Sequence, residues 1–227
     1  MPVVAMERML LATIIVLAVV VAGTLALLAG RSESGVSTTT SNTIVETTTT
    51  SGNSSQTTSG GATPPWRPDG VISPGEYPRH ESFGSGAIEI YWKIENETLY
   101  MALMGRTTGW VAIGFEPSRA MADADIVLGY VTDNGSVIVQ DEYSLGETGP
   151  HKPDTILGGQ YNILASGGAE HDGATIIEFS RPLRTGDSYD KNLASKTTVA
   201  IIWAIGSSDD PRSIHVERGH GALTLRP

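Results

Sequence analysis

Hydrophobic and polar residues alternate in short runs along the second half of the chain. In residues 87–94, AIEIYWKI, the even positions are apolar, whereas Glu89 and Lys93 fall on the opposite face. A period of two is typical of a half-buried β-strand. Runs of the same kind occupy residues 99–105, 109–115, 125–131, 136–143, 174–180, 197–206 and 221–225. Gly, Asn-Gly, Asp and Pro separate them without a long helical period, so we predict an all-β, antiparallel β-sandwich.

A long apolar stretch precedes this region. Residues 9–30 contain no charged side chain, and as an α-helix they would span about 33 Å, close to a bilayer core of roughly 30 Å. A cleavable signal sequence usually has a shorter apolar region of about 7–15 residues, followed by a small-residue cleavage site. We therefore predict an N-terminal flank at residues 1–8 and one transmembrane helix at residues 9–30, with a signal sequence as the alternative.

Residues 31–65 have the composition of a disordered stalk. They hold 19 Ser and Thr among 35 residues and cannot bury enough apolar surface to fold. Asn53, Asn96 and Asn134 begin N-glycosylation sequons, which makes glycans candidate partners of the chain. A stalk of this kind points outward, so we expect a single-pass cell-membrane protein with an extracytoplasmic folded domain at residues 66–227.

Composition and charge exclude several functions. The formal net charge is −10, with 15 Lys and Arg against 25 Asp and Glu, whereas binding to nucleic acid phosphates needs clustered positive charge. The chain has no cysteine, which excludes disulfides, thiolate zinc sites, iron–sulfur clusters and haem attached through a CxxCH motif. We therefore predict no nucleic acid partner, and any redox cofactor has to be held without cysteine.

The segment RSIHVERGHG, residues 212–221, contains two of the five histidines. His215 and His220 are separated by an odd number of positions, so in one regular strand they would point to opposite faces. We therefore expect that they do not hold one metal together and that one of them is incidental. His151 and His171 lie in Gly- and Pro-rich loops and are expected at the surface.

Met121 is the methionine that core packing explains least well. Met101 and Met104 lie in an apolar strand, where core packing is the simpler explanation, whereas Met121 lies in the polar segment EPSRAMADADIVLGYV. The flanking Asp123 and Asp125 are expected to be solvated loop acids or turn caps. A thioether is a soft ligand for haem iron or copper, and methionine with histidine is the ligand pair of low-spin cytochromes.

Five motifs in order resemble the DOMON domain over about residues 69–225: DGVISPGEY, GWVAIGF, MADADIVLGYV, WAIG and HVERGHGALTL. The resemblance implies an immunoglobulin-like β-sandwich. In the haem-binding members, a methionine before the ADxVxG strand and a histidine in an HxxRG segment hold haem b non-covalently. By position these residues correspond here to Met121 and His215, and His220 falls outside the motif. Trp110 and Trp203 lie in apolar strands, where they either pack in the core or flank the haem edge.

The sequence thus predicts a membrane-anchored, extracytoplasmic b-type cytochrome domain that exchanges single electrons with an unknown redox partner protein. No G-x-S-x-G, H-E-x-x-H or P-loop motif is present, which favours an electron carrier over a catalyst and leaves enzymatic activity uncertain. The alternatives are a cell-surface carbohydrate-binding module of the same fold without haem, and a structural domain without a ligand.

Overall fold

The computed structural model describes residues 65–226. The predicted flank at 1–8, the predicted transmembrane helix at 9–30 and all of the predicted stalk except residue 65 lie outside this range. Within the described residues, no helix combines the length and the apolar character needed to cross a membrane. The anchor and the stalk therefore stay predictions.

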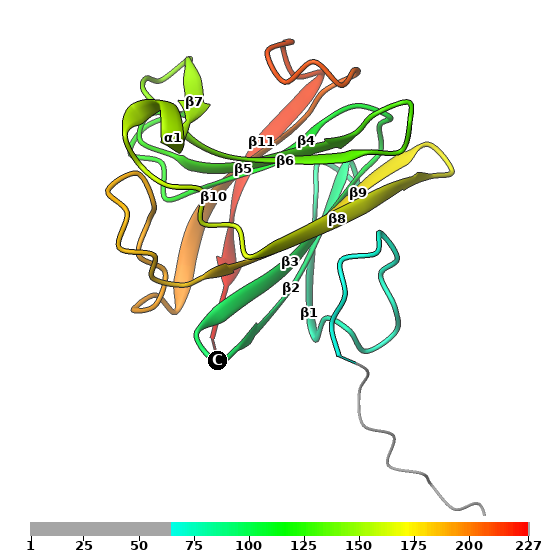
Figure 1. Cartoon of the computed structure of the whole chain (residues 1–227), viewed down its shortest axis with the longest axis horizontal. Coiled ribbons are helices and arrows are strands. Elements are labelled where there is room, and N and C mark those ends of the chain that lie inside the picture. The colour runs from blue at the N-terminus through cyan, green and yellow to red at the C-terminus, as the bar shows by residue number, and fades with distance from the viewer. Residues whose placement is uncertain (1–64, 227) are drawn as a thin grey trace, which may run out of the picture. The chain divides into compact units, whose positions relative to one another are not determined.

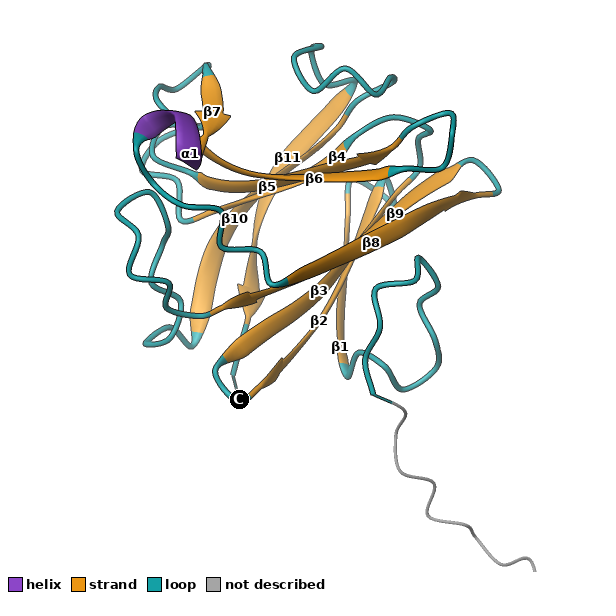
Figure 2. Ribbon diagram, in the orientation of Figure 1, coloured by secondary structure: helices purple, strands orange, loops and turns teal. Residues whose placement is uncertain are grey.

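The described chain consists almost entirely of strands and loops (Figure 2). In chain order the elements are β1 (Arg79–Phe83), β2 (Ile88–Glu95), β3 (Thr98–Gly105), β4 (Val111–Phe115), β5 (Asp125–Val131), β6 (Val137–Ser144), β7 (His151–Pro153), α1 (Asp154–Leu157), β8 (Ala165–His171), β9 (Ala174–Pro182), β10 (Thr198–Ile205) and β11 (Glu217–Thr224).

The strands form two sheets that face each other (Figure 1). One sheet has five strands in the order β1-β2-β3-β9-β8, and the other has six in the order β11-β10-β4-β5-β6-β7. Every neighbouring pair is antiparallel. The predicted antiparallel β-sandwich is therefore confirmed.

The main core lies between the two sheets and follows the predicted alternation. In β2, Ile88 and Ile90 are 0% exposed and Trp92 is 2% exposed, and all three pack in one cluster with residues of the facing sheet. Met101 of β3 is also fully buried in this cluster, whereas Met104 lies on the other face and is half-buried. Burial of each large apolar side chain contributes about 1.5–3 kcal/mol to folding, so this cluster holds the two layers together.

Strand β4 is buried on both faces, from Val111 to Phe115. Its inner side chains belong to the core between the sheets, while Ala112 lies in a second apolar cluster on the outer face of the six-stranded sheet. Trp110, Ile126 and Leu128 belong to the same outer cluster. The six-stranded sheet therefore has an apolar surface on its outer face, separate from the core between the sheets, where a ligand could be held.

The strands at the sheet edges depart from the predicted pattern. Strands β1, β7 and β8 were not predicted, and β11 begins at residue 217 rather than at 221. All four are edge strands. Their sequences are polar or glycine-rich, as in ASGGAEH of β8, because edge strands are more exposed to solvent and polar side chains there discourage pairing with another chain. The bounds predicted for the last strand were wrong for this reason.

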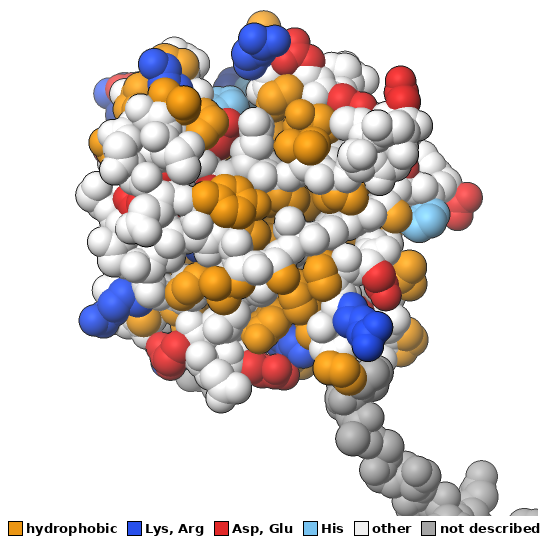
Figure 3. Space-filling model, viewed as in Figure 1, with side chains coloured by type: hydrophobic (Ala, Val, Ile, Leu, Met, Phe, Trp, Pro, Cys, Tyr) orange, Lys and Arg blue, Asp and Glu red, His pale blue; other side chains and the backbone are white. Residues whose placement is uncertain are grey.

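The surface seen in Figure 3 has apolar side chains across its middle and charged side chains mainly toward its rim. Tyr161 and Leu164, in the segment before β8, are 49% and 63% exposed. Single exposed apolar side chains are normal in folded proteins and need no ligand to explain them.

Candidate functional site

An apolar floor lies on the outer face of the six-stranded sheet, over β10, β4 and β5. Ile202 is in register with Gly114, and Gly114 is in register with Ile126, so these three positions share one face. A Cβ on Gly114 would lie 2.8 Å from Ile202 Cγ1, so the glycine gives the isoleucine room to lie across β4. The floor positions are Ala112, Gly114, Ile126, Leu128, Ile202 and Ala204.

Three loops turn this floor into a pocket of about 590 Å³, which we call the sheet-face pocket. They are the β4–β5 loop at residues 116–124, the β6–β7 loop at 145–150 and the β10–β11 loop at 206–216. Small-molecule and cofactor sites in proteins usually have volumes of about 300–1,000 Å³. The charged, histidine and methionine residues of its lining are Arg119, Met121, Glu147, His151, His215, Arg218 and His220.

Met121 is held in this pocket by the backbone of its loop. Its N–H donates to the carbonyl of Glu147 at 3.2 Å, and its own carbonyl accepts from the N–H of Ala124 at 3.1 Å. Ala120 and Asp123 have positive φ angles of 50° and 59°, so the chain turns sharply on both sides of the methionine. The side chain is half-buried. The thioether therefore lies in the pocket wall rather than in the core.

His215 lies in the opposite wall-forming loop, two residues before β11 begins. Its side chain is half-buried, and its Nε2 lies 3.5 Å from a guanidinium nitrogen of Arg218. The N–H of Val216 donates to the carbonyl of Ile205 at 2.9 Å, which joins the end of the loop to β10. The structure thus brings the two predicted ligand residues, Met121 and His215, to the lining of one pocket.

His220 lines the same pocket, contrary to the expectation from strand parity. The expectation assumed one regular strand through positions 215 and 220, but β11 starts at Glu217 and leaves His215 in the loop. His220 is in register with Ile202 of the floor, so it points to the outer face. The prediction that the two histidines lie on opposite faces was wrong, because alternation holds within a strand and not across its start.

The two predicted tryptophans border the pocket from different layers. Trp110 belongs to the outer cluster and donates from Nε1 to Ser213 Oγ at 3.0 Å. Trp203 belongs to the core between the sheets and is 4% exposed. Trp110 is therefore part of the same apolar surface as the floor, whereas the Trp203 ring supports the sheet from inside.

His151 is a pocket residue that sequence reasoning missed. It was expected at the surface, but it is half-buried, lines the pocket and hydrogen-bonds through Nδ1 to the Glu142 carboxylate, which is 4% exposed. A carboxylate on one ring nitrogen orients the imidazole and directs its other nitrogen to a ligand. The Gly- and Pro-rich context of His151 carried no signal of this pairing.

The two aspartates beside Met121 have different environments. Asp123 is exposed, and hydrogen bonds from Ser118 and Tyr143 hold the pKa of its carboxyl below the usual value. Asp125 is 0% exposed and forms an ion pair with the fully buried Arg181 at 2.8 Å. The expectation of a solvated acid or turn cap was therefore wrong for Asp125, because the first residue of β5 points inward.

The described chain is thus an antiparallel β-sandwich with a pocket on the outer face of its six-stranded sheet. The model of the DOMON domain matches residues 84–206. The match covers more than half of the chain, and the chain belongs to the DOMON domain family.

The relatives include DBH-like monooxygenase protein 1 of Mus musculus, which is 34% identical over 144 residues. The same protein of Homo sapiens is 35% identical over 154 residues. These matches cover 62% and 66% of this chain but 22% and 24% of the relatives, so the chain spans about a quarter of their length. Among solved structures, the cytochrome domain of Myriococcum thermophilum cellobiose dehydrogenase is similar with a TM-score of 0.42 and 9% identity, covering 65% of this chain and 81% of that domain.

Proposed function

We propose that the sheet-face pocket binds haem b without a covalent bond and that the domain exchanges single electrons with a partner protein. The observation that carries the proposal is the presence of Met121 and His215 in the lining of one pocket. A thioether and an imidazole are the axial ligand pair of many low-spin cytochromes.

The residues present fit such a cofactor. The pocket of about 590 Å³ has an apolar floor and a polar rim, as a flat macrocycle with carboxylate substituents requires. The chain has no cysteine, so cysteine thioether bonds to the haem vinyl groups are not available, which supports non-covalent attachment. Bound haem would supply a one-electron iron couple.

The chain's own residues would have three tasks. Met121 and His215 would bind the iron from opposite loops, and the apolar floor would exclude water and so influence the reduction potential. Arg119 and Arg218, which lie in the pocket lining with exposed side chains, would pair with the haem carboxylates, since a guanidinium suits planar anions. The Glu142–His151 pair would add an oriented imidazole at the pocket wall.

The proposal includes the topology expected from sequence. The apolar run at residues 9–30 would anchor the protein in the cell membrane, and the Ser/Thr-rich stalk would hold the domain on the extracytoplasmic side. A redox partner would then meet the domain at the membrane surface. Monooxygenase activity, which the names of the relatives state, is not part of the proposal, because the chain spans less than a quarter of their length.

The test is a visible spectrum of the purified full-length chain after titration with haem. We expect one haem per chain, a sharp Soret band and a narrow α band on reduction. Acid–acetone should extract the haem completely. A chain that takes up no haem would refute the proposal and leave the carbohydrate-binding alternative, which a glycan-binding screen of the same preparation would test.

A further inference from the structure

Four carboxylates gather at the end of the sandwich where α1 and the β9–β10 loop, residues 183–197, lie (left in Figure 1). Asp125 begins β5, Asp141 lies in β6, Asp154 begins α1, and Asp190 lies in the loop. Asp125 and Asp154 are 0% exposed, Asp141 is 2% exposed, and the Asp190 side chain is 1% exposed. We call these four residues the acidic cluster; it lies apart from the lining of the sheet-face pocket.

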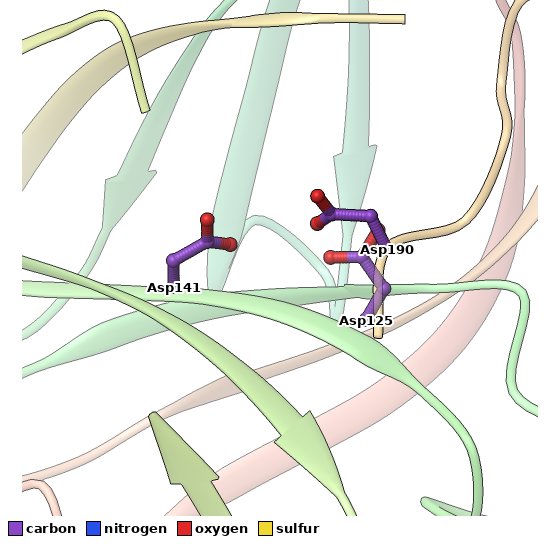
Figure 4. Close-up of side chains that lie close together, drawn as sticks. All are labelled: Asp125, Asp141 and Asp190. Atoms are coloured by element: carbon purple, nitrogen blue, oxygen red, sulfur yellow. The ribbon is translucent and has the colours of Figure 1, made fainter. Parts of the chain in front are cut away.

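The carboxylates of three cluster members point toward one another (Figure 4). One oxygen from each of Asp125, Asp141 and Asp190 lies within 4.8 Å of the other two. Oxygen ligands of one Ca²⁺ lie about 2.3–2.6 Å from the ion, so two ligands on opposite sides are about 5 Å apart. The spacing of the Asp141 and Asp190 oxygens therefore suits a shared ion, whereas both oxygens of Asp125 have other partners.

One positive group lies within the cluster. Arg181 is fully buried and donates to Asp125 Oδ1 at 2.8 Å and to Asp190 Oδ1 at 2.6 Å. The backbone N–H of Lys191 donates to Asp125 Oδ2 at 2.8 Å, which completes the partners of that carboxylate. One guanidinium balances one of four carboxylates, so the ionised cluster would keep an excess of negative charge.

Several cluster oxygens are buried without a hydrogen-bond partner in the described part of the chain. They are Asp141 Oδ1, Asp190 Oδ2 and both carboxylate oxygens of Asp154. The other oxygen of Asp141 accepts the backbone N–H of Asn162 at 2.7 Å. Buried polar atoms are nearly always paired in folded proteins, and an unpaired buried carboxylate is strongly unfavourable. These carboxylate oxygens therefore lack a cation or proton that would neutralise their charge.

We propose that the acidic cluster is a calcium site, with Asp141, Asp154 and Asp190 as carboxylate ligands. The side-chain oxygen of Asn162, whose backbone N–H already contacts Asp141, is also buried without a partner in residues 65–226 and would add a neutral ligand. Calcium takes six to eight oxygens in flexible geometry, whereas magnesium keeps several waters, so a buried cluster of protein oxygens favours calcium. The site does not depend on the proposed haem pocket.

The ion would join parts of the chain that are distant in sequence. Its ligands come from β6, the start of α1 and the β9–β10 loop, and Arg181 of β9 ties Asp190 to Asp125 of β5. Calcium would therefore stabilise this end of the fold. The competing way to neutralise the cluster is protonation, which the experiment has to distinguish.

The experiment measures thermal unfolding of the full-length chain after a chelator has removed divalent cations. The Tm is compared with and without added Ca²⁺. At a free Ca²⁺ concentration about 100-fold above the dissociation constant, Tm should rise by about 5–10 °C. Isothermal titration should give one Ca²⁺ per chain, and Mg²⁺ should produce a much smaller rise in Tm. An equal rise with Mg²⁺ would overturn the assignment to calcium.

Variants distinguish calcium binding at the acidic cluster from a general effect of the salt on stability. Asp154→Asn and Asp141→Asn should each lower calcium affinity at least tenfold, while Asp172→Asn, an exposed residue in the β8–β9 turn, should retain wild-type affinity. Two independent variants guard against a folding defect in one of them. If calcium leaves Tm unchanged and Asp154→Asn is as stable as the wild type, the cluster is neutralised by protons and the proposal fails.

Discussion

Gly219 lies opposite Trp203 in the β10–β11 pair, and the indole ring occupies the space that a side chain at position 219 would need. A Cβ on Gly219 would lie 2.6 Å from Trp203 Cε2, and one on Gly221 would lie 2.3 Å from Phe83 Cε1. Two aromatic rings thus fill the inner side of β11 where glycines leave room. This packing fixes which face of β11 points to the core, and it therefore directs the His220 side chain outward.

Replacing Gly219 with alanine should therefore destabilise the fold. The added methyl group would meet the ring of Trp203, and overpacking of this kind costs about 1–3 kcal/mol. The free energy of unfolding in urea measures the effect. Ala222→Val, on the exposed face of the same strand, is the control and should change it by less than about 0.5 kcal/mol. Equal stabilities of the two variants would contradict the packing argument.

The pocket histidines should differ in their effect on the haem spectrum. His215→Ala should convert the iron to high spin or abolish haem binding, whereas His220→Ala should keep a low-spin spectrum. Met121→Leu keeps the side-chain volume but removes the sulfur, so the reduction potential should fall, because a thioether favours ferrous iron. Spectra and redox titrations of the three variants test this assignment. If His220→Ala alone loses the low-spin spectrum, then His220 and not His215 is the iron ligand.

Arg181 and Lys196 should respond differently to replacement with methionine. Arg181 is completely buried between Asp125 and Asp190, so its loss leaves buried carboxylates unbalanced and should cost about 3–5 kcal/mol. Lys196 pairs with Glu116 at 2.7 Å, but its side chain is 42% exposed, so its loss should cost at most about 1 kcal/mol. Chemical denaturation of both variants gives the comparison, and a small loss for Arg181→Met would contradict the buried ion pair.

Stability in the presence of a chelator should fall as pH rises from about 5 to about 8. Burial and then the charge of Asp141 raise the pKa of Asp154 to about 8, and burial raises the pKa of Asp141 to about 6 despite the nearby Arg181. The folded state therefore holds protons that the unfolded chain releases near its ordinary carboxyl pKa. Their stabilising contribution is complete at low pH and is lost as pH rises through the folded-state pKa values.

The variant Asp154→Asn isolates this contribution. It cannot release a proton at position 154, so its Tm should decline less between pH 5 and pH 8 than the wild-type Tm does. The comparison is made with divalent cations removed, because a bound cation would favour the ionised carboxylates. Parallel pH profiles of the variant and the wild type would show that Asp154 does not titrate in this range.

Protease added to intact cells should release the folded domain. The predicted stalk, residues 31–65, is open to cleavage if it lies outside the cell, whereas the compact β-sandwich resists it. Immunoblotting should show a membrane-bound chain replaced by a soluble fragment near the size of residues 66–227. A chain protected in intact cells and cut after lysis would place the domain in the cytoplasm.

The amino-acid sequence by itself determined the class of fold. Alternation in runs such as residues 87–94 is a local property, because successive side chains of a strand point to opposite faces. The central strands were predicted for this reason, and the polar edge strands β1, β7 and β8 were not. The local context also singled out Met121, a methionine in a polar loop, and the DOMON resemblance paired it with His215.

The tertiary structure decided which further residues join this pair and which distant side chains meet elsewhere in the fold. It placed His215, His220 and His151 in the lining of one pocket with Met121, although these residues come from two loops and two edge strands. It also buried Asp125 against Arg181, 56 positions away in the chain. Contacts of this kind depend on strand register and sheet order, which arise from the packing of the whole core and leave no periodic signal near either residue.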